Sequence, residues 1–121
     1  MPIKRVILYD ELRNAEDLVM LESVGQIVVL SRAVPMPSFW STENFALWAA
    51  KALRNVGYNS ETDAVALVGT LLAISQVIQV ITVQDHAPYS VTVLAFSKAE
   101  NRFAPVVLKE GTSSEVSIHR Q

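Results

Sequence analysis

The stretch that decides the fold is Asp63-Ala-Val-Ala-Leu-Val-Gly-Thr-Leu-Leu-Ala-Ile-Ser-Gln-Val-Ile-Gln-Val-Ile-Thr-Val-Gln84. It begins as a short apolar run, passes through Gly69, and continues as a longer apolar segment with few polar residues. This pattern predicts a buried strand, a tight turn at Gly69 and a helix that begins at Thr70. At 100° per residue the apolar side chains share one half of that helix, which would therefore lie on a sheet. They are Leu71, Ile74, Val77, Ile78, Val80 and Ile81.

Two other interpretations of this stretch deserve comparison. Residues 64–83 carry no charge, and twenty such positions are long enough to span a bilayer. Neither a basic cluster nor an aromatic belt flanks them, and Gly69 and Ser75 interrupt them, so a membrane span is disfavoured. Val77 to Val83 is rich in β-branched residues, which favours a strand. Its apolar spacing nevertheless fits a helical face better than strict alternation.

The composition indicates one domain with an uncovered apolar surface. Residues 1–110 are predicted to form a single α/β domain and residues 111–121 a flexible C-terminal tail. Of the 121 residues, 50% are apolar and only 18% are charged, whereas about a quarter is usual. Too few charges remain to cover the surface, so we expect a second copy of the chain to cover part of it, giving a homo-oligomer.

Charge and cysteine content exclude several classes of protein. The net charge of −2 gives no basic surface for nucleic acid. The absence of cysteine excludes a disulfide framework, a thiolate nucleophile and a cysteine-based zinc site. Asp10 and Glu11 come too early for a signal peptide, so a cytoplasmic protein is expected. The sequence indicates no cofactor and no metal site.

The N-terminal half predicts two strands and two helices. Ile3 to Tyr9 is an apolar run that reads as a strand buried on both faces. Asn14 can cap a short helix with Leu18 and Leu21 facing inward, and Gln26 to Ser31 is the second strand. A loop with Pro35 and Pro37 begins at Arg32. Ser41 or Thr42 then caps a helix that runs to about Val56, ends at Gly57, and buries one face: Phe45, Trp48, Ala49, Ala52, Leu53 and Val56.

The C-terminal part predicts a hairpin. Ser90 to Ser97 is an alternating apolar run, and Phe103 to Lys109 is expected to return antiparallel to it. Pro105 suits an edge strand because proline lacks a backbone donor. The resulting order, βαβαβαββ, predicts a small Rossmann-like three-layer domain with a mainly parallel sheet and an antiparallel edge hairpin.

In such sheets, ligands bind beyond the carboxyl ends of the parallel strands. That rule selects a candidate ligand site at one edge, formed by Asp10, Ser31, Arg32, Gly69 and Thr70. Free amides at the start of the helix after Gly69 suit a small anionic ligand, and Arg32 would supply the counter-charge. The segment lacks the repeated glycines of a dinucleotide fingerprint and the Lys-Ser/Thr ending of a P-loop. A tight turn and a helix N-cap are the simpler interpretation of Gly69 and Thr70, and a lone arginine such as Arg32 is more often a surface group or an ion-pair partner.

No catalytic motif is evident. Asp10 at a strand end could act as an acid or base, although a solvated carboxylate is the simpler interpretation. Asp85 and His86 are direct neighbours, which rarely hydrogen-bond as a catalytic pair requires. His119 lies in the predicted tail, so a two-histidine metal site is disfavoured. A non-enzymatic role is therefore favoured.

Two features point to a partner surface. Phe39 and Trp40 beside prolines could anchor a partner or stack on a base, or instead fold back as a plug before the next helix. The polar side of the central helix, with Gln76 and Gln79, carries no ion, whereas exposed helix faces usually carry Lys and Glu. We therefore expect a self-associating binding or assembly module, with an interface across this helix or the edge hairpin. The alternative is a phosphate- or nucleotide-binding sensor or enzyme that uses the strand edge.

Overall fold

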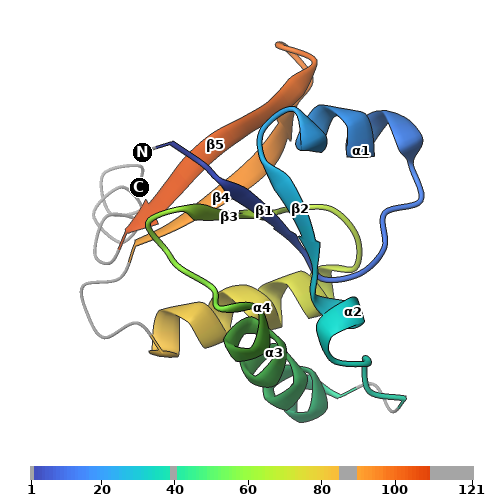
Figure 1. The fold of residues 1–121 in the computed structure, drawn as a ribbon, viewed down its shortest axis with the longest axis vertical. Coiled ribbons are helices and arrows are strands. Elements are labelled where there is room, and N and C mark those ends of the chain that lie inside the picture. The colour runs from blue at the N-terminus through green and yellow to red at the C-terminus, as the bar shows by residue number, and fades with distance from the viewer. Residues whose placement is uncertain (1, 39–40, 85–89, 110–121) are drawn as a thin grey trace, which may run out of the picture.

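The chain folds around one five-stranded sheet with strand order β2-β1-β3-β4-β5. Figure 1 shows the computed structural model, which describes residues 2–38, 41–84 and 90–109. The first four strands are parallel and the last is antiparallel to its neighbour. This confirms the predicted α/β fold with a mostly parallel sheet. The strands are β1 (Arg5–Leu8), β2 (Gln26–Val29), β3 (Asp63–Ala66), β4 (Ser90–Ser97) and β5 (Arg102–Lys109).

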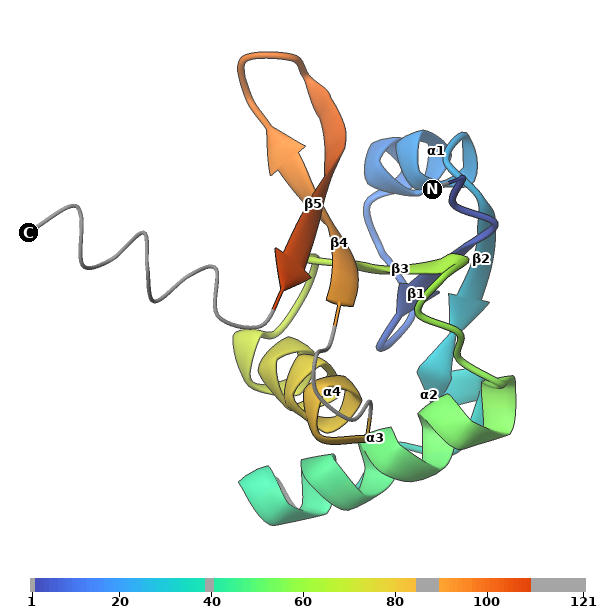
Figure 2. The same ribbon diagram turned by 90° about the vertical axis from the view of Figure 1, so that its left-hand side faces the viewer.

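Helices cover both faces of the sheet. Helix α1 (Ala15–Glu22) lies on one face, while α2 (Leu30–Ala33), α3 (Thr42–Val56) and α4 (Leu71–Gln84) gather on the other (Figures 1 and 2). Each face therefore has its own apolar core. On the α3 and α4 side the core includes Phe45, Trp48, Val77 and Ile81, and on the α1 side it includes Leu8, Leu21, Leu94 and Phe103.

The central stretch folds as predicted except at Leu71, which was assigned to the inward face of the helix but is 79% exposed. The strand β3 is buried at all four positions, Gly69 follows it with a positive φ of 108°, and α4 begins directly after Thr70. The segment Val77 to Val83 is helical, so the alternative strand interpretation was wrong. Within the three described ranges, no helix is long and apolar enough to cross a membrane.

The predicted helix caps are confirmed. Asn14 Oδ1 accepts hydrogen bonds from the backbone N–H groups of Glu16 and Asp17 at 3.0 and 3.1 Å. Ser41 Oγ accepts from the N–H of Asn44 at 3.1 Å. Gly57 ends α3 in the left-handed conformation, with φ 68°. These three residues act locally, which is why the sequence pattern identified them.

The second strand is shorter than predicted. β2 stops at Val29, and Leu30–Ala33 form the short helix α2 in place of the expected strand end and loop start. The backbone N–H of Ser31 still donates to the carbonyl of Tyr9 at 3.1 Å, while the bond from the N–H of Val34 to the carbonyl of Leu30 at 3.0 Å closes the helical turn. The element order consequently gains a helix relative to the predicted βαβαβαββ.

The predicted turn at Asp85 and His86 and the tail 111–121 lie outside the described residues.

The hairpin of β4 and β5 forms the far edge of the sheet. Leu94 pairs with Pro105, and the Leu94 carbonyl accepts from the N–H of Leu67, so the backbone of Leu94 faces β3. In an antiparallel pair, the backbone N–H and C=O groups of two opposite residues either all point toward the other strand or all point away from it. The backbone groups of Leu94 point away from β5, so the nitrogen of Pro105 points away from β4, toward the open edge. Its missing donor therefore costs the sheet no hydrogen bond, as expected for an edge strand.

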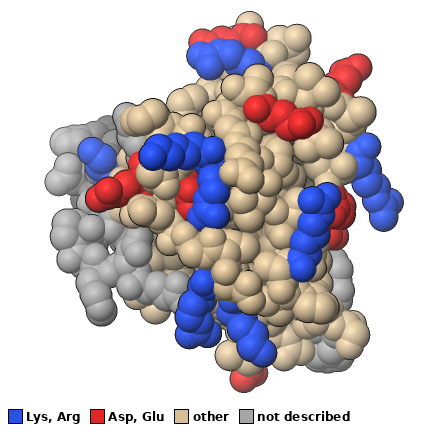
Figure 3. All heavy atoms as spheres, viewed as in Figure 1, with Lys and Arg blue, Asp and Glu red and all other residues tan. Residues whose placement is uncertain are grey.

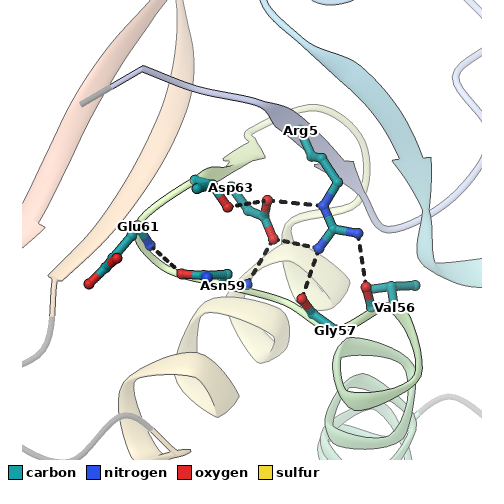
Figure 4. Close-up of polar contacts among 7 residues, drawn as sticks. Arg5, Val56, Gly57, Asn59, Glu61 and Asp63 are labelled. Carbon is teal, nitrogen blue, oxygen red and sulfur yellow. Dashed lines mark hydrogen bonds and ion pairs between the residues drawn. The ribbon is translucent and has the colours of Figure 1, made fainter.

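An ion pair joins the first and third strands next to the C-terminal end of α3. Arg5 Nε and Nη2 donate to the two carboxylate oxygens of Asp63 at 3.0 and 2.7 Å (Figure 4). The same guanidinium donates to the carbonyls of Val56 and Gly57, each at 2.9 Å. Arg5 thereby satisfies the free carbonyl end of α3 and holds it against the sheet.

Asp63 is the buried member of this pair and is completely enclosed. It also accepts from the backbone N–H of Asn59 at 2.8 Å and from the hydroxyl of Thr62 at 3.1 Å. Burial alone raises the pKa of the Asp63 carboxyl, but these hydrogen bonds and the Arg5 charge outweigh burial and hold the pKa below its usual value. The carboxylate therefore stays ionised inside the fold.

Candidate functional site

The predicted ligand residues gather at the carboxyl edge of the parallel strands. β1 lies between β2 and β3. The chain first adds β2 on one side of β1 and later adds β3 on its other side, so the strand order reverses at β1. Ligands of open α/β sheets bind in the crevice at such a reversal. Asp10 follows β1, Ser31 and Arg32 lie in α2, and Gly69 and Thr70 follow β3. The topology thus places them at a common edge.

The side chain of Tyr9 fills the position predicted for an anion. The backbone N–H of Thr70 donates to the Tyr9 hydroxyl at 3.0 Å, and that hydroxyl donates to Thr70 Oγ1 at 3.0 Å. The Tyr9 ring lies against Gly69 so closely that an added Cβ would overlap Cε1 of the ring. Tyr9 directly precedes Asp10 and is selected by the same strand-edge rule, but its pairing with Thr70 was not predicted.

The remaining polar groups at this edge are paired with one another. Ser31 Oγ donates to Asp10 Oδ1 at 2.6 Å. The guanidinium of Arg32 donates to both oxygens of Glu11, at 2.8 Å for the Nη2 contact. Hydrogen bonding to Glu11 and its charge raise the pKa of Arg32. An anionic ligand at this edge would therefore have to compete with Glu11 for Arg32 and with Tyr9 for Thr70.

Replacing Tyr9 with phenylalanine should lower the free energy of unfolding by about 1 kcal/mol. The phenyl ring keeps the packing against Gly69, but the N–H of Thr70 loses its acceptor in a half-buried place. The effect is measured by urea denaturation. Thr70→Ser is the matched control, since it retains both the backbone donor and the hydroxyl and should unfold near the wild-type midpoint. Equal midpoints for Tyr9→Phe and the wild type would show that the hydroxyl does not hold the start of α4.

The second candidate surface is a groove between α3 and α4. It has a volume of about 270 Å³, and Gln76 and Gln79, both predicted to meet a partner, line it. The other lining residues are alanines of α3 and valines of α4. We call it the α3–α4 groove, and its complete lining is Ala46, Ala50, Gln76, Gln79, Val80 and Val83.

A second hollow adjoins this groove across α3. It measures about 420 Å³ and lies between α3 and the proline-containing segment that precedes it. Trp48 closes its floor by donating from Nε1 to the carbonyl of Val34 at 2.7 Å. Ala50 lines both hollows. The two hollows thus form one surface over α3. Phe39 and Trp40, also predicted to meet a partner, lie outside the described residues.

The charged side chains give little support to nucleic-acid or metal binding. On the face shown in Figure 3, Lys and Arg side chains lie among Asp and Glu, with wide uncharged areas between them. Protein surfaces that bind nucleic acid instead gather Lys and Arg side chains together. Among the residues that the structure describes, no cluster of His, Asp or Glu could hold a metal ion.

Comparison with known proteins identifies no relative. No family model matches the chain, and no curated protein and no solved structure is significantly similar to it.

Proposed function

We propose that this chain is a non-enzymatic assembly module that associates with further copies of itself through the outer side of its α3–α4 layer. The observation that carries the proposal is the α3–α4 groove, whose lining is apolar apart from the amides of Gln76 and Gln79. Contiguous apolar surface with a polar rim is typical of protein interfaces. Glutamine amides tolerate burial against a partner better than the ammonium and carboxylate groups common on exposed helices.

Exposed apolar side chains at the groove and at the hollow that adjoins it support the same surface as the interface. Leu47 of α3 is 66% exposed, and Val83 of α4 is 73% exposed. Single exposed apolar residues are normal on proteins. Val83 lines the α3–α4 groove, however, and Leu47 lines the hollow that adjoins it across α3. The low share of charged residues in the chain leaves few ions to solvate the groove. A second copy of the chain would remove this surface from water.

The strand order β2-β1-β3-β4-β5 supports placing the chain among small Rossmann-like three-layer domains. That class hosts many unrelated functions and does not itself select one. A cytoplasmic location is part of this proposal.

The second candidate is a ligand site at the strand edge, favoured by the convergence of Asp10, Ser31 and Thr70 there. A ligand that binds only the folded chain raises its melting temperature. A rise with inorganic phosphate or a nucleotide that disappears in Arg32→Ala would favour this candidate. We rank it second because the polar groups at the edge already satisfy one another.

Self-association should appear as a concentration-dependent mass. By light scattering after size exclusion, the mass should rise from 13.3 kDa toward twice that value as concentration increases. Val83→Lys should keep the chain monomeric over the same range, because it places an ammonium beside the α3–α4 groove that a second copy would have to desolvate. Val83 is highly exposed, so its replacement should leave the fold intact.

Val19→Lys is the matched control for this experiment. Val19 is an exposed valine of α1, 66% accessible, and α1 lies on the opposite face of the sheet (Figure 2). This variant should associate like the wild type. A wild-type chain that stays monomeric at high concentration would contradict the proposed function. Equal effects of Val83→Lys and Val19→Lys on association would show that the interface does not lie at the groove.

A further inference from the structure

The outer side of α3 carries a ridge of four residues with symmetric spacing. Glu43, Leu47, Ala50 and Arg54 are separated by four, three and four positions, so they lie on one side of the helix. We call these four residues the α3 ridge. Glu43, Leu47 and Arg54 are exposed, and Ala50 is half-buried. The core residues Phe45, Ala49 and Leu53 occupy the opposite side of the same helix.

The charges at the two ends of the ridge are available for a partner. Among the described residues, the side chains of Glu43 and Arg54 are engaged in no ion pair. They lie eleven positions apart, which is about 16 Å along a helix, so they cannot pair within one chain. A complementary surface would need a cation opposite Glu43 and an anion opposite Arg54, separated by the same distance.

A second copy of α3 that runs antiparallel provides that surface. The spacing of the ridge reads the same in both directions, so a two-fold axis at its centre sets Glu43 opposite the partner's Arg54. It also sets Leu47 opposite the partner's Ala50. We propose that the chain forms a two-fold dimer through antiparallel pairing of its α3 ridges in this register. The inference rests on the proposed function and specifies its partner surface.

Side-chain size fits this register as well as charge does. Each exposed leucine meets a small alanine, which leaves room for the larger side chain and lets the helices approach to about 8–10 Å. The leucine would fill the surface over Ala50, which lines both hollows beside α3. A large residue packed over a small one is the arrangement that close helix packing requires.

A parallel pairing of the same ridge fails on charge. It would set Glu43 against the partner's Glu43 and Arg54 against the partner's Arg54, and like charges held together at an interface oppose association. Lys51 also lies one turn before Arg54 and is exposed, so in the antiparallel register the partner's Glu43 meets a cationic end of the helix. Charge therefore selects the antiparallel orientation.

The size of the contact predicts a weak dimer. A pair of four-turn helices buries less than a standard interface, and interfaces below about 1,200 Å² are typical of transient complexes. We expect a dissociation constant of roughly micromolar order. The measurements below therefore need analytical ultracentrifugation over a range of concentrations rather than at a single dilute one.

Charge exchange tests the register. Glu43→Arg and Arg54→Glu should each weaken dimerisation at least about tenfold, because each creates two like-charge contacts across the two-fold axis. The double variant Glu43→Arg/Arg54→Glu restores opposite charges at both contacts and should dimerise within about threefold of the wild type. The double variant opposes the helix dipole at both ends, so improved folding of the monomer cannot explain the recovery.

Glu22→Arg provides the matched control, since it makes the same change of charge at an exposed residue of α1, on the other face of the sheet. It should dimerise like the wild type. Circular dichroism confirms that each variant is folded. Single variants that weaken the dimer without recovery in the double variant would overturn the register.

The absence of cysteine allows a second, independent test. A mixture of Leu47→Cys and Ala50→Cys chains should form mixed disulfides under mild oxidation faster than either variant alone. Homodisulfides that form faster than mixed ones would overturn the antiparallel register. A dimer insensitive to all ridge variants would overturn this inference yet leave the proposed function standing, whereas a monomeric wild type would contradict both.

Discussion

Asp63→Ala is expected to lower the free energy of unfolding by about 3 kcal/mol. The variant removes a fully buried carboxylate and leaves the guanidinium of Arg5 in a largely enclosed place without its counter-charge. Breaking one member of a buried pair costs up to about 5 kcal/mol, and the 25% exposure of Arg5 places this case at the lower end. Urea denaturation followed by circular dichroism measures the loss.

Glu11→Ala is the matched control, because it also removes a carboxylate from a pair with arginine. The pair of Glu11 and Arg32 is exposed at both side chains, 55% and 68%. Exposed pairs contribute little to stability, so this variant should unfold at the wild-type midpoint within experimental error. Comparable losses in the two variants would contradict a structural role specific to Asp63.

Acid should act on the same pair. The pKa of Asp63 is lower in the folded chain than in the unfolded chain, so the unfolded chain binds the proton first as the pH falls. The stabilisation is therefore fully present above the ordinary aspartate pKa of about 3.9 and is lost as the pH falls through the lower folded value. Asp63→Asn should remove this part of the acid dependence, which denaturation curves recorded across the acidic range would reveal.

Gly69→Ala is expected to lower the free energy of unfolding by about 2–4 kcal/mol. The φ of 108° disfavours any side chain, and the added Cβ would also lie 2.7 Å from the hydroxyl and 2.9 Å from Cζ of Tyr9. Tyr9 would have to leave the start of α4, so the hydrogen bonds to Thr70 would be lost with it. Thermal and urea denaturation measure the combined cost.

Gly57→Ala separates the two causes of this loss. Gly57 also has a positive φ, 68°, but an added Cβ would meet no atom within 4 Å. Its replacement should cost only the strain, about 1–2 kcal/mol. In a Tyr9→Ala background, Gly69→Ala should fall toward this smaller cost. An unchanged cost in that background would mean that strain alone explains the effect.

The sequence predicted those features that depend on near neighbours along the chain. The cap at Asn14 acts over two and three residues, and the cap at Ser41 acts over three. The helix after Gly69 follows from the spacing of its own apolar residues. In such local patterns the interacting residues lie close together in the sequence, so the sequence alone is enough to identify them.

The features that were missed depend on distant partners. Arg5 and Asp63 are 58 residues apart, and Tyr9 and Thr70 are 61 apart. Both contacts exist because β1 lies beside β3, and hydrophobic periodicity does not specify strand order. The end of β2 was also misplaced, because the apolar run continues through Leu30 although the backbone already enters α2 there. The candidate ligand residues could be assigned to one edge, whereas their mutual pairing could not.

The interior position of β1 has a consequence for synthesis of the chain. β1 is translated before β2 and β3, yet it is complete only when both lie beside it. In a nascent chain that has not reached Asp63, β1 pairs with β2 but has no neighbour on its other edge, and the apolar face beneath α3 still lacks α4. Unpaired edges and uncovered apolar faces promote aggregation and slow folding. Emergence of β3 from the ribosome is therefore the event that commits the N-terminal half to its fold.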